Sequence, residues 1–299
     1  MIQRRVGTEL QGVTVGFLLA KWGSNIGWFL PYSLFALIFL VFPSWGLVGG
    51  SLHNVSGHLT FANFRQLFQR QFLEAYGSTI LLSGLTALTG GLLGLVLSWA
   101  ISVGGLPQIL RSSVLTFSGV ASNFAGVPLA FAFTATLGPA GLVTEFLRQH
   151  LHFDLYAHGF TLFGFSGLAL TYLYFQIPLM VLIIGPTVAS MGRWSDAAAS
   201  LGASWWQYWR YVGVAVLWRP FLGALLLLFG NSFGAYATAY ALTSGQVNLI
   251  PILIGEVMSG NVLYNPGFGD AMAVGMLVVM TMVYGLYALI HRQGRKWQT

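Results

Sequence analysis

Six long apolar runs without a charged side chain constrain what this chain can fold into. As a helix that rises 1.5 Å per residue, each run is long enough to cross a hydrocarbon core of about 30 Å. The runs cover residues 28–48, 75–103, 113–137, 162–189, 221–242 and 271–290. Only 7% of the residues are charged, whereas a soluble domain has about 25%. The sequence therefore predicts an all-α integral membrane protein with six transmembrane helices.

Glycines recur within these runs. Four of them, Gly84, Gly90, Gly91 and Gly94, lie in the second run. Small residues let the backbones of neighbouring transmembrane helices approach closely. We therefore expect these glycines to serve helix packing rather than ligand binding.

The basic residues between the runs predict the orientation. With the N-terminus inside, 10 of the 13 Lys and Arg residues lie on the cytoplasmic side, and Arg65, Arg70 and Arg148 lie outside. Because Lys and Arg accumulate in cytoplasmic loops, both termini are expected in the cytoplasm. The ten inner residues are Arg4, Arg5, Lys21, Arg111, Arg193, Arg210, Arg219, Arg292, Arg295 and Lys296. Dispersed in short connections, they form no basic face for nucleic acid.

The first 25 residues are expected to form a cytoplasmic N-terminal arm, and residues 26–299 a six-helix transmembrane domain. Apolar residues of the arm fit one face of an interfacial helix, and a loosely ordered tail fits equally well. Glu9 and Lys21 interrupt any apolar core of a cleavable signal peptide, so none is expected.

The outer connections, residues 49–74, 138–159 and 243–270, are the surface expected to face an external partner. The first contains LTFANFRQLF, which predicts a short amphipathic helix. Five of the six histidines fall on this side: His53, His58, His150, His152 and His158. Their spacing lacks a helical ligand pair and no carboxylate-rich motif joins them, so ordinary loop histidines are favoured over a metal site. The absence of cysteine excludes disulfides and thiolate ligands.

Two motifs of enzymes and nucleotide-binding proteins are absent. The sequence has no G-x-x-x-x-G-K-[ST] phosphate loop and no H-E-x-x-H. We therefore expect no catalytic residue, no bound metal and no cofactor in this chain, and any ATP must be bound by a separate subunit. The six runs also lack Asp, Glu, Lys, Arg and His, which argues against an ion-coupled transporter because coupling needs such groups.

Polar side chains inside the runs have two open interpretations. Each forms a hydrogen bond between helices, worth about 0.6 kcal/mol on average, or lines a translocation path. The candidates for a path are Asn123, Gln176, Asn231, Ser232 and Tyr236. Pro128 and Pro178 lie inside apolar runs and are expected to kink their helices.

The segment from Asp196 to Pro220 is the main polar and aromatic interruption between the runs. It predicts two short helices joined near Gly202 and lying at the membrane surface. Asp196 would begin the first of them, where the helix dipole favours a carboxylate. The second is rich in Trp and Tyr, and an exposed aromatic face of this kind needs a partner.

This segment resembles the EAA loop of permease subunits of bacterial ABC importers. Asp196, Ala197 and Ala198 stand at the E-A-A positions, and Gly202 follows at the family's spacing. Asp196 replaces the usual glutamate, and Ala215 replaces the usual proline. The resemblance covers most of the chain, from residue 28 to residue 297. The segments SNFAGVPLAFAF and SFGAYATAYAL are similar to a subgroup that handles polyamines, iron, thiamine or phosphonates.

The resemblance implies a type I ABC importer permease in the bacterial cytoplasmic membrane. Its partners would be a dimer of ATPase subunits that use ATP and magnesium, an external solute-binding protein, and membrane lipid. A second permease subunit would complete the path, and the resemblance favours a related chain, which makes a heterodimer. Residues 193–219 would form the loop that couples the permease to the ATPase. The coupling residues implied are Asp196, Ala197, Ala198, Gly202, Ala203, Trp206, Arg210 and Val212. The solute would be polyamine-like or another small solute.

Two alternatives remain open from the residues alone. A secondary transporter or channel would move its solute without an ATPase partner. A membrane scaffold would leave solute uptake unchanged when the chain is deleted.

Overall fold

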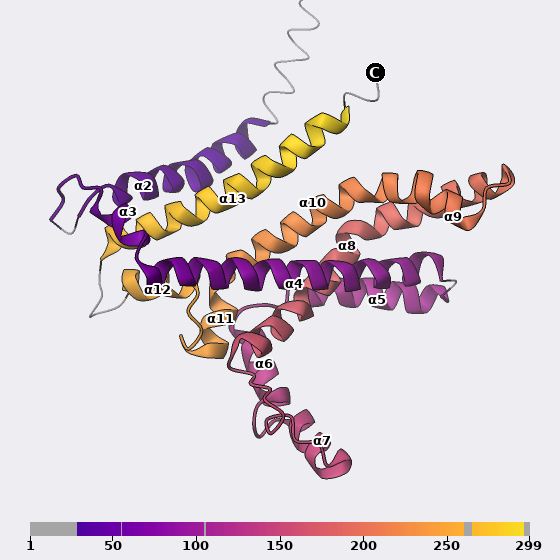
Figure 1. The fold of residues 1–299 in the computed structure, drawn as a ribbon, viewed down its shortest axis with the longest axis horizontal. Helices are drawn as coiled ribbons and strands as arrows, with labels where there is room; N and C mark the ends of the chain where they lie inside the picture. The colour runs from indigo at the N-terminus through magenta and orange to yellow at the C-terminus, as the bar shows by residue number, and fades with distance from the viewer. Residues whose placement is uncertain (1–28, 55, 105, 260–264, 296–299) are drawn as a thin grey trace, which may run out of the picture.

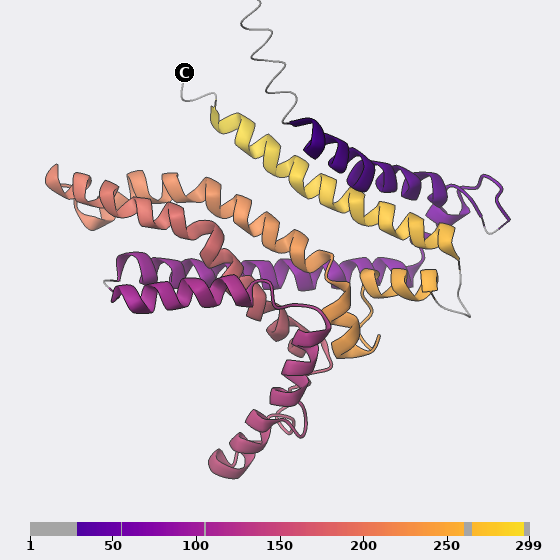
Figure 2. The ribbon, with the colours of Figure 1, turned by 180° about the vertical axis from the view of Figure 1, so that it is seen from behind.

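The computed structural model describes residues 29–54, 56–104, 106–259 and 265–295, and the N-terminal arm lies outside them. The described part is helical and contains no strand (Figures 1 and 2). A first helix, Phe29–Ser51, includes the π-helical turn η1 (Leu37–Val41) and α2 (Phe42–Ser51). The others are α3 (Ala62–Leu67), α4 (Arg70–Val103), α5 (Gln108–Ala121), α6 (Val127–Leu137), α7 (Leu142–Leu151), α8 (Phe165–Ser200), α9 (Trp205–Tyr208), η2 (Trp209–Gly213), α10 (Val214–Phe233), α11 (Tyr236–Thr243), α12 (Ile250–Ser259) and α13 (Pro266–Arg295).

The centre of the molecule is the seam between α4 and α8, which run in the same direction. A side chain added at Gly94 would lie 2.5 Å from Met180 Cβ and 2.7 Å from the Ile177 carbonyl oxygen. At Gly90 it would meet Gln176 at 2.9 Å. The two backbones therefore approach as closely as the glycine content of the second apolar run predicts. The helix α10 packs antiparallel against both (Figure 1).

The first helix and α13 form a separate pair along one side of this core (Figures 1 and 2). Gly50 lies directly against the carboxylate of Asp270 near the start of α13. The Tyr76 hydroxyl on α4 donates a hydrogen bond of 2.6 Å to the Met272 carbonyl oxygen and joins the pair to the core. Most side chains of the first helix remain exposed along its whole length.

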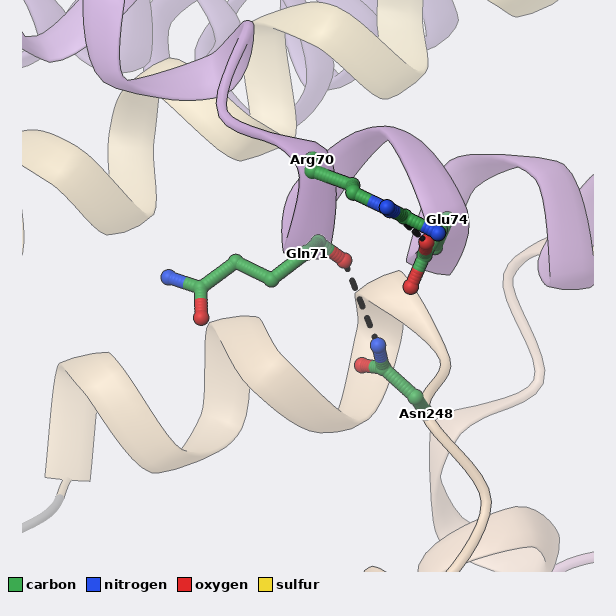
Figure 3. Close-up of polar contacts among 4 residues, drawn as sticks. All are labelled: Arg70, Gln71, Glu74 and Asn248. Atoms are coloured by element: carbon green, nitrogen blue, oxygen red, sulfur yellow. Dashed lines mark hydrogen bonds and ion pairs between the residues drawn. The ribbon is translucent and has the colours of Figure 1, made fainter.

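At the end of the molecule that carries α3 and α12, hydrogen bonds join the start of α12 to α4. Asn248 donates a hydrogen bond of 3.2 Å to the Gln71 carbonyl oxygen at the start of α4, where Arg70 and Glu74 form an exposed ion pair (Figure 3). About two turns further along α4, Thr79 accepts a hydrogen bond of 3.0 Å from the Ile250 backbone N–H. A helix is present in the segment predicted to be amphipathic, as α3, although it is only six residues long.

Six helical stretches long and apolar enough to cross a membrane are present in the described residues, as the sequence predicts. Two boundaries were wrong. The third predicted run, residues 113–137, is broken at 122–126, and the structure's third candidate is Val127–Leu151. The fifth, residues 221–242, is broken at Gly234 and Ala235, and its helix instead extends back to Trp205. Hydropathy misses both breaks because the residues at them are uncharged and too few to interrupt a long apolar window.

Glycine explains the first of these breaks. Gly126 has φ of +75°, a conformation that residues with a side chain rarely adopt, and it ends the irregular segment before α6. Pro128 is then in the first turn of α6, so the predicted kink at this residue was wrong. Pro178 does lie inside α8, as does Pro186.

From the break at 122–126, α6 and α7 project away from the core, and α7 ends the projection (Figures 1 and 2). His150 stacks on Phe146, and His158 stacks on Phe153. No group of three or more potential metal ligands occurs among the described residues. His150 lies within α7, whereas His158 lies in the connection that follows it.

Candidate functional site

The turn between α8 and α9 is the first part of the candidate site. The Ala203 N–H donates to the Ala198 carbonyl oxygen at 3.0 Å, and the Gly202 N–H donates to that of Ala199 at 2.9 Å. This pair of bonds is a Schellman motif, which requires a left-handed residue just past the helix end. Gly202 supplies it with φ of +79°. The predicted turn near Gly202 is therefore present.

The predicted pair of separate short helices is wrong. Asp196, Ala197 and Ala198 continue α8 without interruption to Ser200, because alanine is the strongest helix former and nothing breaks the helix before Gly202. Asp196 lies near the C-terminal end of α8 rather than at an N-terminus. Its carboxylate therefore gains nothing from the helix dipole.

Past the turn, the chain enters the next long helix through a well-defined cap. The Ser204 hydroxyl accepts a hydrogen bond from the Gln207 N–H at 3.3 Å, while the Gln207 side chain accepts one from the Ser204 N–H at 2.7 Å. This capping box satisfies two otherwise unpaired donors. The π-helical turn η2 follows and leads directly into α10. Arg219, predicted in the loop, therefore lies inside α10.

A buried hydrogen bond ties the two arms of this hairpin together. The Tyr208 hydroxyl donates to the Met191 carbonyl oxygen at 3.0 Å. Gly213 leaves room for the ring of Trp209, since a side chain there would meet that ring at 2.7 Å. We call residues 191–213 the coupling hairpin. Figure 1 shows it at the far right end of α8 and α9, beyond the end of α4.

The outer surface of the coupling hairpin is apolar and exposed. The side chains of Leu201, Trp205, Trp206 and Tyr211 are each at least 66% exposed. Of the other predicted coupling residues, Asp196, Ala197, Gly202 and Arg210 are exposed, whereas Ala198, Ala203 and Val212 are half-buried. No ion pair in the described part of the chain involves Asp196 or Arg210. A surface of this composition is suited to covering by another protein.

The structure separates the predicted path residues. Gln176 is fully buried in the α4–α8 seam, where its amide nitrogen donates to the Thr86 hydroxyl at 3.1 Å and its amide oxygen has no partner. Ser232 is buried and bonds to its own helix at the Leu228 carbonyl oxygen. Asn123 and Asn231 are exposed. Gln176 and Ser232 are therefore enclosed within the single chain in this conformation.

The two breaks in the third and fifth predicted runs meet each other. The Gly126 N–H donates to the Thr238 hydroxyl at 2.7 Å. Tyr172 from α8 donates its hydroxyl to the Ala235 carbonyl oxygen at 2.9 Å. Tyr236, which begins α11, stacks on Tyr240 with ring centroids 5.5 Å apart. Sequence reasoning missed Thr238 and Tyr172, and only the glycines beside the breaks gave a signal for this junction.

No protein-family profile matches the chain. The chain is 23% identical to a probable sulfate transport system permease protein of Chlorella vulgaris over 223 residues, which cover 72% of this chain and 77% of that one.

Two solved structures have similar folds. A bacterial ABC transporter that imports the acidic polysaccharide alginate superimposes with a TM-score of 0.71 and 19% identity, covering 92% of this chain and 97% of that one. The alginate transporter in complex with a periplasmic protein bound to an alginate pentasaccharide superimposes with a TM-score of 0.68 and 19% identity. This match covers 92% of this chain and 96% of that one. The cytoplasmic placement of both termini stays a prediction. The predicted all-α fold is confirmed, and it resembles the fold of ABC importer permeases. Together with the six candidate spans, it supports the predicted multi-pass protein of the inner membrane.

Proposed function

We propose that this chain is the transmembrane permease subunit of an ATP-driven importer in a bacterial cytoplasmic membrane, with its termini and coupling hairpin in the cytoplasm. The observation that carries the proposal is the coupling hairpin, an exposed aromatic turn between two long spans in a chain with the fold of an ABC importer permease. ATP would be hydrolysed by separate subunits, since the sequence has no phosphate loop.

In this mechanism an ATPase subunit covers the exposed side chains of the coupling hairpin. Leu201, Trp205 and Trp206 supply the apolar contact, and the charged groups of Asp196 and Arg210 are available for ion pairs with the ATPase. Nucleotide binding biases the ATPase dimer between two arrangements. The attached hairpin then biases the spans between two packings, which is alternating access.

The translocation path would form against a second permease subunit. Asn123, Asn231 and Tyr236 are exposed in the single chain, so they can line such a path, whereas Gln176 and Ser232 are buried. An external solute-binding protein would deliver the solute to the opposite end, as the periplasmic protein seen with the alginate transporter would for that system. The second subunit is expected to be a related permease rather than a copy of this chain, and mass spectrometry of the purified complex would identify it.

The solute class that we propose is a small anion. The relative in Chlorella vulgaris is a probable sulfate permease, and the alginate transporter imports an acidic polysaccharide. Neither comparison supports the polyamine-like solute expected from the sequence. The test is to identify the solute-binding protein that purifies with this chain and to measure its affinity for sulfate and for spermidine. Tighter binding of sulfate is expected for a small-anion importer.

The experiment that tests the proposal compares two substitutions at Gly202. No atom lies within 4 Å of a side chain added there, so a substitution acts through the backbone alone. Gly202→Val opposes the left-handed conformation, at a cost of about 1–3 kcal/mol, whereas Gly202→Asn tolerates it. Purified from mild detergent, the valine variant is expected to retain roughly tenfold less ATPase than the asparagine variant, because the Schellman turn opens.

Uptake of the solute should fall in parallel, with membrane insertion of both variants unchanged. Equal ATPase retention by the two variants would remove the turn from the mechanism. A wild-type chain that purifies without any ATPase would contradict the importer as a whole and favour a transporter that acts alone.

A further inference from the structure

A small pocket lies at the base of the coupling hairpin. Its volume is about 120 Å³, and four aromatic side chains line it together with three residues of α8. We call it the aromatic pocket. The lining residues are Trp99, Met191, Gly192, Ser195, Trp205, Tyr208 and Trp209. A water molecule occupies about 30 Å³ in the liquid, so the pocket is only a few times larger than one water. It therefore has room for a single small chemical group.

The rings of Tyr208 and Trp209 in the aromatic pocket are held in place by other contacts. The Tyr208 hydroxyl is engaged by the Met191 carbonyl oxygen. Trp209 lies 6.1 Å from Trp205 and 5.8 Å from Tyr208, measured between ring centroids, and its ring also rests on Gly213. A ligand therefore meets a pocket that is already formed, which lowers the entropic cost of binding.

The position of the pocket across the membrane follows from its place at the end of α4. Trp99 lies one turn before Val103, the last residue of α4, where the chain leaves the second candidate span. Six of the ten tryptophans occur in or beside this end of the molecule: Trp99, Trp194, Trp205, Trp206, Trp209 and Trp218. Tryptophan collects where lipid headgroups meet water. The pocket is therefore at headgroup depth, while Gly202 lies further out along the hairpin.

The chemistry of the lining favours a cation. The negative faces of Trp and Tyr rings attract ammonium groups, and aromatic cages are the usual site for them. No acidic or basic side chain lines the pocket. Arg193, Asp196 and Arg210 directly follow the lining residues Gly192, Ser195 and Trp209 in the sequence, and all three are exposed. The two arginines outnumber the one carboxylate, and their guanidinium groups can hold a phosphate.

We propose that the aromatic pocket binds the ammonium headgroup of a phospholipid, with the lipid phosphate held by Arg193 or Arg210. One molecule satisfies both features, because an ammonium and a phosphate are separated by only two carbons in such headgroups. The site requires only that this end of the molecule lies at the membrane surface. It shares Trp205 and Arg210 with the surface assigned above to the ATPase, so the experiment measures lipid binding both with and without the partner subunits.

The test measures lipid binding to the full chain by native mass spectrometry, together with whatever subunits it retains in mild detergent. The probes are phosphatidylethanolamine and phosphatidylglycerol with the same acyl chains, since only the first has an ammonium group. Wild type is expected to bind phosphatidylethanolamine about tenfold more tightly than phosphatidylglycerol, the size of a partly desolvated cation–π contact. Phosphatidylcholine should bind at least as tightly as phosphatidylethanolamine.

Matched tryptophan variants locate the site. Trp205→Leu and Trp99→Leu should abolish the preference for phosphatidylethanolamine, while Trp206→Leu, an exposed neighbour that does not line the pocket, should keep it. Replacing both arginines, Arg193→Gln with Arg210→Gln, should weaken both lipids by a similar factor, because both carry the phosphate.

Three results would overturn the proposal. One is equal binding of the two lipids to wild type. Another is an equal loss for Trp205→Leu and Trp206→Leu. The third is phosphatidylethanolamine that binds the isolated chain but is excluded whenever the partner subunits are attached, since the pocket would then belong to a protein contact.

Discussion

The helices of the α4–α8 seam have hydropathies similar to those of the first helix and α13. They differ in how much of each helix is buried inside the chain. In the most apolar windows of α4 and α8, 39% and 56% of the residues are buried, against 0% and 6% in the first helix and α13. Gly94 of α4 touches the neighbouring backbone, whereas Gly46 of the first helix has no atom within 4 Å of an added side chain. Hydropathy thus identifies a span, but the neighbours of its small residues decide whether it belongs to the core.

The largest expected effect comes from adding one methyl group to the seam. Gly94→Ala would press on Met180 and on the Ile177 carbonyl oxygen, and overpacking of this kind costs about 1–3 kcal/mol. Gly46→Ala, the matched change in the first helix, is expected to have no measurable cost. The midpoint of thermal unfolding in detergent measures both. Equal midpoints for the two variants would break the distinction between seam and periphery.

A smaller effect separates the two partners of the buried polar contact. Thr86→Val removes the acceptor of the Gln176 amide and leaves that amide wholly unpaired, at a cost of about 1–2 kcal/mol. Gln176→Leu removes both the hydrogen bond and the unpaired oxygen, so its effect on stability should be close to zero. Unfolding midpoints should therefore rank Gln176→Leu above Thr86→Val. The reverse order would mean that the Gln176 amide oxygen is satisfied by a group such as a buried water.

The smallest expected effect lies on the peripheral pair. Trp45 is 77% exposed, so Trp45→Ala should change the free energy of unfolding of the isolated chain by no more than about 0.5 kcal/mol. Chemical denaturation of the monomer, checked for its oligomeric state, gives the value. A loss as large as that of Gly94→Ala would show that Trp45 is packed within the monomer and would contradict its peripheral position.

Much of this fold could be predicted because its main signal is local. The number of spans follows from charge-free runs, and Gly202 marks a turn that a helix of alanines cannot otherwise make. The limits of the third and fifth spans could not be predicted. The junction in which Gly126 bonds to Thr238 and Tyr172 bonds to Ala235 joins residues far apart in sequence. Its polar groups look like ordinary interruptions until tertiary packing brings them together.

The candidate site divides in the same way. The composition of residues 196–215 was sufficient to indicate an exposed aromatic surface, and the structure confirms its turn. The continuity of that surface with α8 and α10 was missed, because short helices and the ends of long helices have the same local sequence signals. The aromatic pocket was also missed, since Trp99 belongs to a different run.

The unbroken path of α8 from the buried seam to Ser200 has a mechanical consequence. From Pro186 to Ser200 the helix extends about 21 Å at 1.5 Å per residue. A tilt of about 10° around Pro186 would therefore move the tip by about 4 Å, while atoms one turn from the proline would move by only about 1 Å. As in a lever, the smaller displacement near the seam goes with a larger force there. A small force on the few exposed side chains at the tip would therefore act strongly on the tightly packed core.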